Sequence, residues 1–332
     1  MADSDAERLR IFAPKASAAF GAAVALSMGR PLDPMEEREF EDHEHKARPL
    51  VGVRGCDAYV IQGLHDDPGQ SPNDKLVRLL FFLGCLRSNG AARTTAVIPY
   101  LAYARKDRQT KPRDPLSLSY VARLIEAMGT GRVLTFEPHN LAAVQNAFRI
   151  EVVALDLRGV MIARAAALAG GDPVTVASPD PGGVKRAQLF REALEARIGR
   201  SVAFAFLEKR RSAGVVSGSL LAGDVHGRRV LVVDDLIAGG GTMRRAAAAL
   251  KAAGAASVHA LAAHGLFTSG AEALSDPAVD GWHVTDSIPS RGAEPGNRSK
   301  IDSVSAAPLF AEAIRRLHLD GQVSDLISGL WR

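Results

Sequence analysis

The stretch Val230–Met243 reads VLVVDDLIAGGGTM and decides the fold class. It opens with a continuous apolar run, which is typical of a strand buried on both faces of a parallel sheet. Two adjacent carboxylates, Asp234 and Asp235, follow the run, and the glycines of 239–241 come next. Strong helix formers begin at Met243. The stretch therefore predicts a strand, an acidic pair, a glycine loop and a helix, in that order.

The glycine loop has the chemistry of an anion site. Glycines let the backbone come close to an anion, and the start of a helix supplies N–H groups and a positive dipole end. The carboxylates of Asp234 and Asp235 would accept hydrogen bonds from sugar hydroxyls beside a bound phosphate. Three glycines alone are also compatible with a plain tight turn. The spacing matches neither a Walker A loop nor G-x-G-x-x-G, which excludes the two common nucleotide fingerprints.

Length and composition indicate a globular protein of two domains. The chain has 332 residues, of which 47% are hydrophobic and 23% charged. The net charge of +4 favours anionic small molecules, but basic runs are short and aromatic residues make up only 5%, so we expect no nucleic-acid partner. The N-terminus lacks an apolar signal core, and no apolar run reaches the roughly 18 residues of a membrane span. Cys56 and Cys85 have no metal-like spacing, so we expect reduced thiols and a cytoplasmic protein without a membrane partner.

Strand-like and helix-like segments alternate along the chain, which predicts an α/β architecture with mostly parallel sheets. The expected strands are 57–62, 94–99, 132–136, 152–157, 174–177, 202–207, 230–233, 258–263 and 282–285. The expected helices are 74–84, 117–128, 160–169, 183–194 and 307–317. Because ligands bind at the carboxyl ends of parallel strands, the polar clusters that follow these strands are candidate sites. These clusters are 103–108, 137–139, 178–183 and 234–242.

Three of the clusters carry charges suited to phosphates. The basic residues from Arg105 to Arg113 predict either a triphosphate clamp or a solvated loop. Asp180 is either a helix cap or a carboxylate associated with Mg²⁺. His139 is either a structural histidine or, together with the nearby Glu137, a group that touches a metal or nucleotide phosphates. Residues 208–214, which carry the cations of 209–211, predict a basic surface loop or a mobile lid over a transferring group.

Together these motifs resemble the ribose-phosphate pyrophosphokinase family, in the family's order from about residue 12 to residue 326. Val232–Thr242 is similar to the loop for phosphoribosyl pyrophosphate that type I phosphoribosyltransferases share. Ile98–Arg108, IPYLAYARKDR, is similar to the family's ATP-binding signature, and Phe40–Glu44, FEDHE, resembles its nucleotide-contacting hairpin. The resemblance implies two phosphoribosyltransferase-like domains, each a mostly parallel sheet flanked by helices. Their expected bounds are 8–150 and 151–318, with a tail at 319–332.

The resemblance also implies a reaction and a set of roles. The ribose 1-hydroxyl attacks the β-phosphorus of Mg-ATP, giving phosphoribosyl pyrophosphate and AMP, in a homo-oligomer such as a dimer or hexamer. ATP would be bound by Arg105, Lys106 and His139, and by Phe40, Asp42 and Glu44 of a neighbouring subunit. Ribose 5-phosphate would be bound by Asp234, Asp235, Ala238, Gly239, Gly240, Gly241 and Thr242. Mg²⁺ would be served by His139 and Asp180, and the transition state by Lys209 and Arg211.

The sequence departs from the family pattern inside the site. The loop usually begins Asp-Thr before Gly-Gly-Thr, whereas this chain has Ala238 and Gly239. Pro138 stands in the usual Asp-Leu-His, Lys106 replaces a usual Gln and His43 a usual Gly. The alternatives are therefore a catalytically weak homologue that regulates a true synthetase, a phosphoribosyltransferase that consumes phosphoribosyl pyrophosphate, and a diphosphokinase for a related sugar phosphate.

Overall fold

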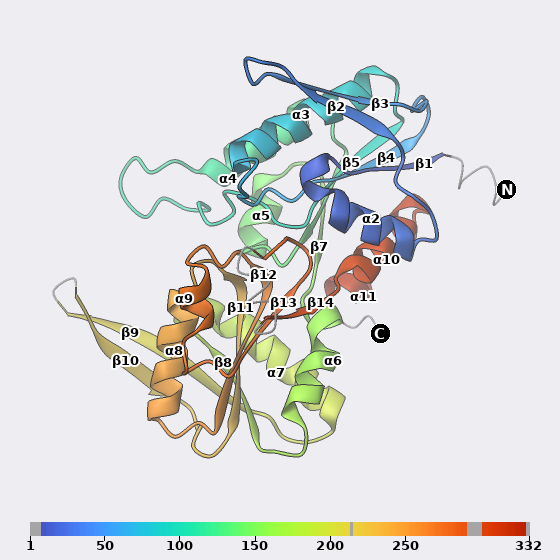
Figure 1. The fold of residues 1–332 in the computed structure, drawn as a ribbon. Helices are drawn as coiled ribbons and strands as arrows, with labels where there is room; N and C mark the ends of the chain where they lie inside the picture. Colours follow the sequence, from blue (N-terminus) through green and yellow to red (C-terminus); the bar gives the residue numbers. More distant parts are fainter. Residues whose placement is uncertain (1–7, 213–214, 291–300, 330–332) are drawn as a thin grey trace. The chain divides into compact units, whose positions relative to one another are not determined.

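The computed structural model describes residues 8–212, 215–290 and 301–329, and the chain forms two compact units (Figure 1). Unit 1 combines residues 1–156 with 306–332, and unit 2 is 157–305. The expected bounds of 8–150 and 151–318 need correction, because the last long helix belongs to unit 1 and not to the second domain. No helix among the described residues is long and apolar enough to cross a membrane.

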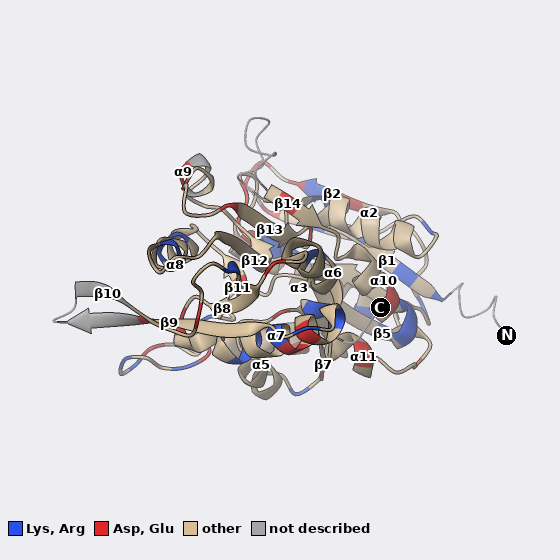
Figure 2. Ribbon diagram, turned by 90° about the horizontal axis from the view of Figure 1, so that it is seen from below, with Lys and Arg blue, Asp and Glu red and all other residues tan. Residues whose placement is uncertain are grey.

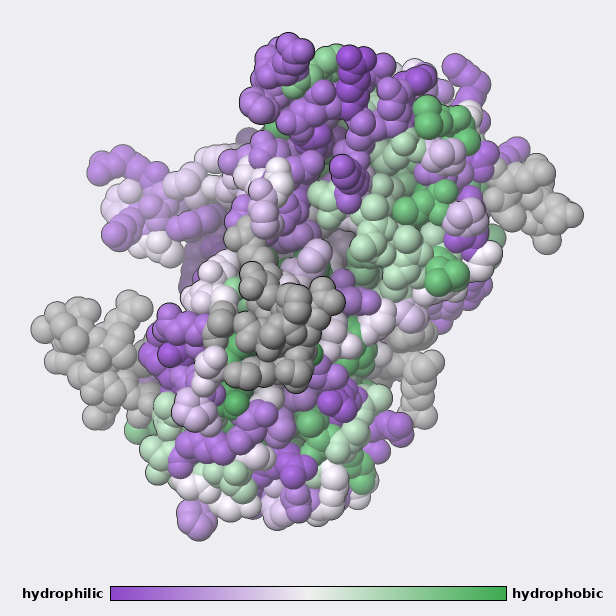
Figure 3. Space-filling model, in the orientation of Figure 1, coloured by the Kyte–Doolittle hydropathy of each residue, from purple (hydrophilic) through white to green (hydrophobic). Residues whose placement is uncertain are grey.

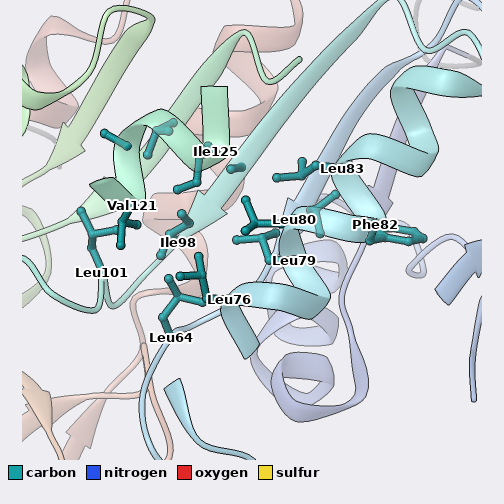
Figure 4. Close-up of a cluster of buried hydrophobic side chains, with 14 of the residues drawn as sticks. Leu64, Leu76, Leu79, Leu80, Phe82, Leu83, Ile98, Leu101, Val121 and Ile125 are labelled. Carbon is teal, nitrogen blue, oxygen red and sulfur yellow. The ribbon is translucent and has the colours of Figure 1, made fainter. Parts of the chain in front are cut away.

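Unit 1 is built on a five-stranded sheet in which all neighbours are parallel. Its order is β1 (Leu9–Phe12), β4 (Asp57–Ile61), β5 (Arg93–Ile98), β6 (Arg132–Phe136) and β7 (Glu151–Leu155). One face carries α3 (Pro72–Ser88), α4 (Ser117–Ala127) and α5 (Leu141–Ala147), whose leucines and β-branched residues pack on Ile98 and its neighbours (Figure 4). Strands β4, β5 and β6 are buried on both faces, which explains their continuous apolar runs.

Helix α3 starts earlier than the sequence pattern predicts because its N-terminus is capped. The Ser71 hydroxyl accepts from the Asp74 N–H, the Asp74 carboxylate accepts from the Ser71 N–H, and Pro72 occupies the first turn. This reciprocal capping satisfies N–H groups that a helix start leaves without partners.

The opposite face of this sheet is covered by α2 (Ala18–Ser27) and α10 (Ala307–His318). The fully buried Phe310 of α10 meets Phe20 and Phe136 edge-to-face, with ring centroids 5.3 and 5.8 Å away. At the end of α10, His318 Nδ1 lies 2.9 Å from the buried Asp57 carboxylate on β4. These contacts place α10 in unit 1, although it follows all of unit 2 in sequence.

A two-stranded antiparallel hairpin, β2 (Met35–Glu39) and β3 (His45–Pro49), also belongs to unit 1. It is anchored on α3, where Arg78 donates to Glu39 at 2.6 Å and the His45 ring stacks on Phe81. Its surface is mostly hydrophilic, as the purple region at the top of Figure 3 shows. The hairpin tip, residues 40–44, is exposed and carries three acidic side chains: Glu41, Asp42 and Glu44.

Unit 2 is built on a seven-stranded sheet with one antiparallel edge strand. Its order is β10 (Val215–Ala222), β9 (Ala203–Ser212), β8 (Val174–Ser178), β11 (Arg229–Ile237), β12 (Ser257–Gly265), β13 (Gly281–Thr285) and β14 (Ile301–Val304). The apolar side of α8 (Gly241–Ala252) packs on one face. Helices α6 (Arg158–Ala169) and α7 (Val184–Ile198) pack against each other, and α7 contacts β8 and β11. Unit 2 also contains the short η2 turn (Pro181–Gly183) and α9 (Ala271–Leu274). Unit 1 also contains the η1 turn (Lys15–Ser17) and α11 (Ser324–Ile327).

Two strands of unit 2 run further than their apolar patterns predict. Strand β11 continues to Ile237 because β12 pairs with it as far as Gly265, so the aspartate pair lies inside the strand. Strand β9 continues to Ser212 because β10 folds back along it as a hairpin (Figure 1). The lid loop expected at 208–214 is wrong for residues 208–212, which are strand; residues 213 and 214 lie outside the described residues.

Candidate active site

The loop after β11 is shaped by two of its glycines. Gly240 has a φ of +78°, which non-glycine residues rarely adopt, and it caps α8. A Cβ at Gly239 would lie only 2.8 Å from Ser269 Oγ, so this position fits no side chain without a shift of the serine. Helix α8 begins at Gly241, and its first turn presents backbone N–H groups and a positive dipole end at the carboxyl edge of the sheet. This geometry suits a phosphate.

Arg186 contacts both carboxylates at the end of β11. Nη1 of Arg186 is 3.5 Å from Asp234 Oδ1 and 3.4 Å from Asp235 Oδ1. Burial, and next the neighbouring Asp235 charge, hold the pKa of Asp234 well above its usual value, although Arg186 acts in the opposite direction. The pair is therefore an acidic site with the Arg186 guanidinium beside both carboxylates.

Arg186 was not among the sequence-predicted site residues. It is carried by α7, a helix rich in charged side chains (Figure 2). The signal was its place just after the polar cluster of 178–183, but only the fold shows that it faces β11. Asp234 and Asp235 themselves come together as the sequence predicts.

The turn before α7 explains the position of Asp180. Its Oδ1 accepts from the Gly182 N–H at 3.0 Å, so the helix-cap interpretation is confirmed. The Ser178 hydroxyl donates to the Asp180 carbonyl at 2.6 Å, and a Cβ at Gly183 would lie 2.7 Å from that hydroxyl. The turn is thus built tightly at the carboxyl end of β8, next to the strand that carries the acidic pair.

In unit 1, the basic loop and His139 follow neighbouring strands, β5 and β6. Arg105 and Lys106 are exposed, and the Lys106 N–H donates to the Tyr103 carbonyl in a turn. The Asn140 amide, one residue after His139, donates to the Asp107 carboxylate at 2.7 Å. The two clusters are therefore joined, and the exposed His139 lies on the segment that touches the basic loop.

The Pro138 departure coincides with an unusual backbone. Glu137, the residue before it, has a φ of +43°, and its N–H donates to the Leu155 carbonyl at 3.0 Å. Non-glycine residues in this region are uncommon and are often found at functional sites. The strained residue lies directly before the segment that carries His139.

The tip of the β2–β3 hairpin carries Phe40, Asp42 and Glu44, all exposed. The guanidinium of Arg38 lies 5.0 Å from the centre of the Phe40 ring. His43 adopts a φ of +67°, a backbone conformation that glycine adopts more readily than other residues. Lys209 and Arg211 lie on β9, opposite Ser219 and Val216 of β10.

The donor set suits a metal that arrives with its substrate. The described residues contain no cluster of three or more His, Cys, Asp or Glu side chains arranged to hold a metal ion. Mg²⁺ commonly binds one or two protein carboxylates and takes its other ligands from phosphates and water. Asp180, in unit 2, offers a carboxylate, and His139, in unit 1, offers an imidazole, and both are groups that ligate metal ions.

The fold and the loop define a class: α/β proteins with a glycine loop at the carboxyl edge of a parallel sheet. Residues 9–129 match a family model described as the N-terminal domain of ribose phosphate pyrophosphokinase, and residues 215–328 match one described as the phosphoribosyl synthetase-associated domain. The chain belongs to the ribose-phosphate pyrophosphokinase family, whose members are transferases.

Individual relatives match over nearly the whole chain. The ribose-phosphate pyrophosphokinase of Wolinella succinogenes is 36% identical, covering 96% of this chain and 98% of the relative. That of Caldanaerobacter subterraneus is 37% identical with the same coverage. The crystal structure of the phosphoribosylpyrophosphate synthetase of Mycobacterium smegmatis superposes with a TM-score of 0.81 at 29% identity, covering 95% of this chain and 100% of that chain.

Proposed function

We propose that this chain makes phosphoribosyl pyrophosphate and AMP from ribose 5-phosphate and Mg-ATP. The observation that carries the proposal is the joined acidic pair and glycine loop at one edge of unit 2. The backbone N–H groups of 239–242 bind the 5-phosphate, and the carboxylates of Asp234 and Asp235 accept from the ribose hydroxyls. Arg186 keeps the two carboxylates in place.

ATP is the proposed second substrate. Arg105 and Lys106 offer positive charge to its phosphates, and His139 adds a further donor on the adjoining segment. The exposed Phe40, with Asp42 and Glu44, contacts the nucleotide of a neighbouring subunit, so the proposal includes a homo-oligomer, a dimer or a hexamer.

The transfer itself needs positioning and charge neutralisation. The ribose 1-hydroxyl releases its proton to solvent as its oxygen forms a bond to the β-phosphorus. The bond from that phosphorus to the oxygen bridging it to the α-phosphorus breaks, and AMP leaves with that oxygen. Lys209 and Arg211 stabilise the negative charge on the transferring phosphoryl oxygens. Mg²⁺, held in part by Asp180 and His139, supplies further charge neutralisation when it is bound.

The same proposal places the protein in the cytoplasm. ATP and Mg²⁺ are abundant there, and its reducing conditions suit the free thiols of Cys56 and Cys85.

The test is an assay of AMP release with ATP, Mg²⁺ and ribose 5-phosphate. Release that depends on ribose 5-phosphate supports the proposal, and Asp235→Asn is expected to abolish it. ATP binding without turnover would instead support a regulatory homologue. Turnover that requires phosphoribosyl pyrophosphate and a base would support a phosphoribosyltransferase. Turnover only with another pentose phosphate would reassign the sugar.

A further inference from the structure

A second loop lies against the loop at 238–240, which we propose binds the phosphate and call the phosphate loop. The Thr268 N–H donates to the Ala238 carbonyl at 2.9 Å, and the Leu266 N–H donates to the Ile237 carbonyl at 2.9 Å. A further bond from the Gly270 N–H to the Phe267 carbonyl closes residues 267–270 into a tight turn. This turn, the 267–270 turn, is thus fixed to the start of the phosphate loop by backbone hydrogen bonds.

The turn places two hydroxyls where the phosphate loop lacks a side chain. The position that a Cβ of residue 239 would take is 2.8 Å from Ser269 Oγ and 3.4 Å from Thr268 Oγ1. Both side chains are exposed. Neither hydroxyl bonds to another residue within the described part of the chain, so each is available to a ligand. A hydroxyl carried by residue 239 itself would occupy nearly the same space.

We propose that Ser269, supported by Thr268, supplies the 5-phosphate of the sugar with the hydroxyl donor that Gly239 cannot. The hydroxyl can then come from either position. Because Gly239 has no side chain, Ser269 of the neighbouring turn can place its hydroxyl at this point of the phosphate loop. The inference rests on the proposed function, because it names a further positioning residue for the same sugar phosphate. A hydroxyl is a natural donor to a phosphate oxygen.

If Ser269 supplies the hydroxyl that Gly239 lacks, each single variant should weaken the binding of ribose 5-phosphate and the double variant should restore it. Ser269→Ala removes the donor and raises the KM for ribose 5-phosphate roughly tenfold, as loss of one hydrogen bond to a charged group does. Gly239→Thr also weakens binding, because its Cβ meets Ser269 Oγ at 2.8 Å. The double variant Gly239→Thr with Ser269→Ala recovers most of the loss, because the hydroxyl is restored from the other side.

The experiment measures the KM for ribose 5-phosphate and for ATP, and calorimetric binding of ribose 5-phosphate, in all three variants. Ser269→Thr, which keeps the hydroxyl, serves as the conservative variant. Ser201→Ala serves as the remote control. It removes an exposed serine just before β9, at the amino ends of the parallel strands, whereas the phosphate loop follows the carboxyl end of β11. Thermal unfolding of each variant checks that the fold is retained.

Unchanged KM and affinity in Ser269→Ala, or a double variant worse than both single variants, would overturn the inference. An equal rise in the KM for ATP would also overturn it, because the effect would then not be specific to the sugar. Failure of the proposed function is a separate result: the wild-type chain would release no AMP with ribose 5-phosphate.

Discussion

The ionised form of Asp234 is unfavourable in the fold, because burial and the neighbouring Asp235 charge raise the pKa of its carboxyl. Its raised pKa means that the folded state loses stability as the pH rises above the ordinary value of 3.8, where the unfolded chain releases this proton freely. Each pKa unit of such a shift corresponds to about 1.4 kcal/mol. The acidic pair is thus an unfavourable arrangement for the fold that a sugar-binding role would explain.

Asp234→Asn is therefore expected to raise the free energy of unfolding at pH 7 while it lowers activity. The gain disappears near pH 3, where the wild-type carboxyl is protonated in both states. Urea unfolding at the two pH values measures it. Asp224→Asn is the control, because the Arg228 hydrogen bond lowers the pKa of that exposed carboxylate, and it should give no gain. A wild-type protein more stable than Asp234→Asn at pH 7 would contradict the sign.

Sequence reasoning at this scale found the groups that are adjacent in the chain. Asp234, Asp235 and the loop glycines form one continuous motif, so pattern alone predicts them. Arg186 and Ser269 reach the same place from α7 and from the turn after β12, through space. The sequence shows that Arg186 follows a polar cluster, but it does not show which strand either side chain contacts.

At the scale of elements, the β9–β10 hairpin carries the cations assigned to the transition state. Lys209→Ala is expected to reduce kcat by about 100-fold or more, as loss of a transition-state donor does, and to leave the KM for ATP nearly unchanged. Steady-state kinetics with ATP and ribose 5-phosphate measure both. Arg197→Ala, an exposed cation at the end of α7, is the control. A raised KM with normal kcat would assign Lys209 to ground-state binding.

A pair of histidines joins strands β12 and β13. His259 Nδ1 lies 3.2 Å from His283 Nε2, and His283 in turn meets Asp302 at 2.9 Å. Burial, and next the neighbouring His283, lower the pKa of His259 to about 4. Asp280 acts in the opposite direction, and Arg229 and Lys251 act with His283.

Because the unfolded chain binds this proton near pH 6.5 and the folded chain does not, stability falls as the pH drops from 6.5 to 4. His259→Gln is expected to remove about 2 kcal/mol of that loss. Unfolding free energies at pH 7 and 4.5 test it, with the exposed His226→Gln as control. An identical pH dependence in wild type and His259→Gln would contradict the prediction.

The sequence predicts elements best where they are buried. The continuous apolar runs of β4, β5, β6, β8, β11 and β13 stand out because both faces of those strands are covered. The strands it missed are short or polar: β1 and β14 have four residues each, and β2 reads MEERE. Their positions depend on pairing with neighbours, which a local pattern does not record.

At the scale of the whole molecule, the closing segment of the chain completes the core of unit 1. Phe310→Ala is expected to destabilise unit 1 by about 3–5 kcal/mol, because it leaves a cavity between two other aromatic rings. Thermal unfolding followed by limited proteolysis measures this and identifies the unit affected. Leu319→Ala, at a side chain that is 55% exposed, should cost little. Cleavage confined to 157–305 in Phe310→Ala would contradict the assignment of α10 to unit 1.

The return of α10 makes unit 2 an insertion. The chain leaves unit 1 after β7, forms unit 2 with residues 157–305, and returns to unit 1 before α10. Unit 2 is therefore connected at both of its ends to unit 1. Unit 2 can therefore be exchanged for the unit 2 of a relative by joining the chains at both boundaries, 156/157 and 305/306. A single junction after residue 156 would instead take α10 of unit 1 from the other protein. Chimaeras of this family that respect both junctions therefore keep each hydrophobic core whole.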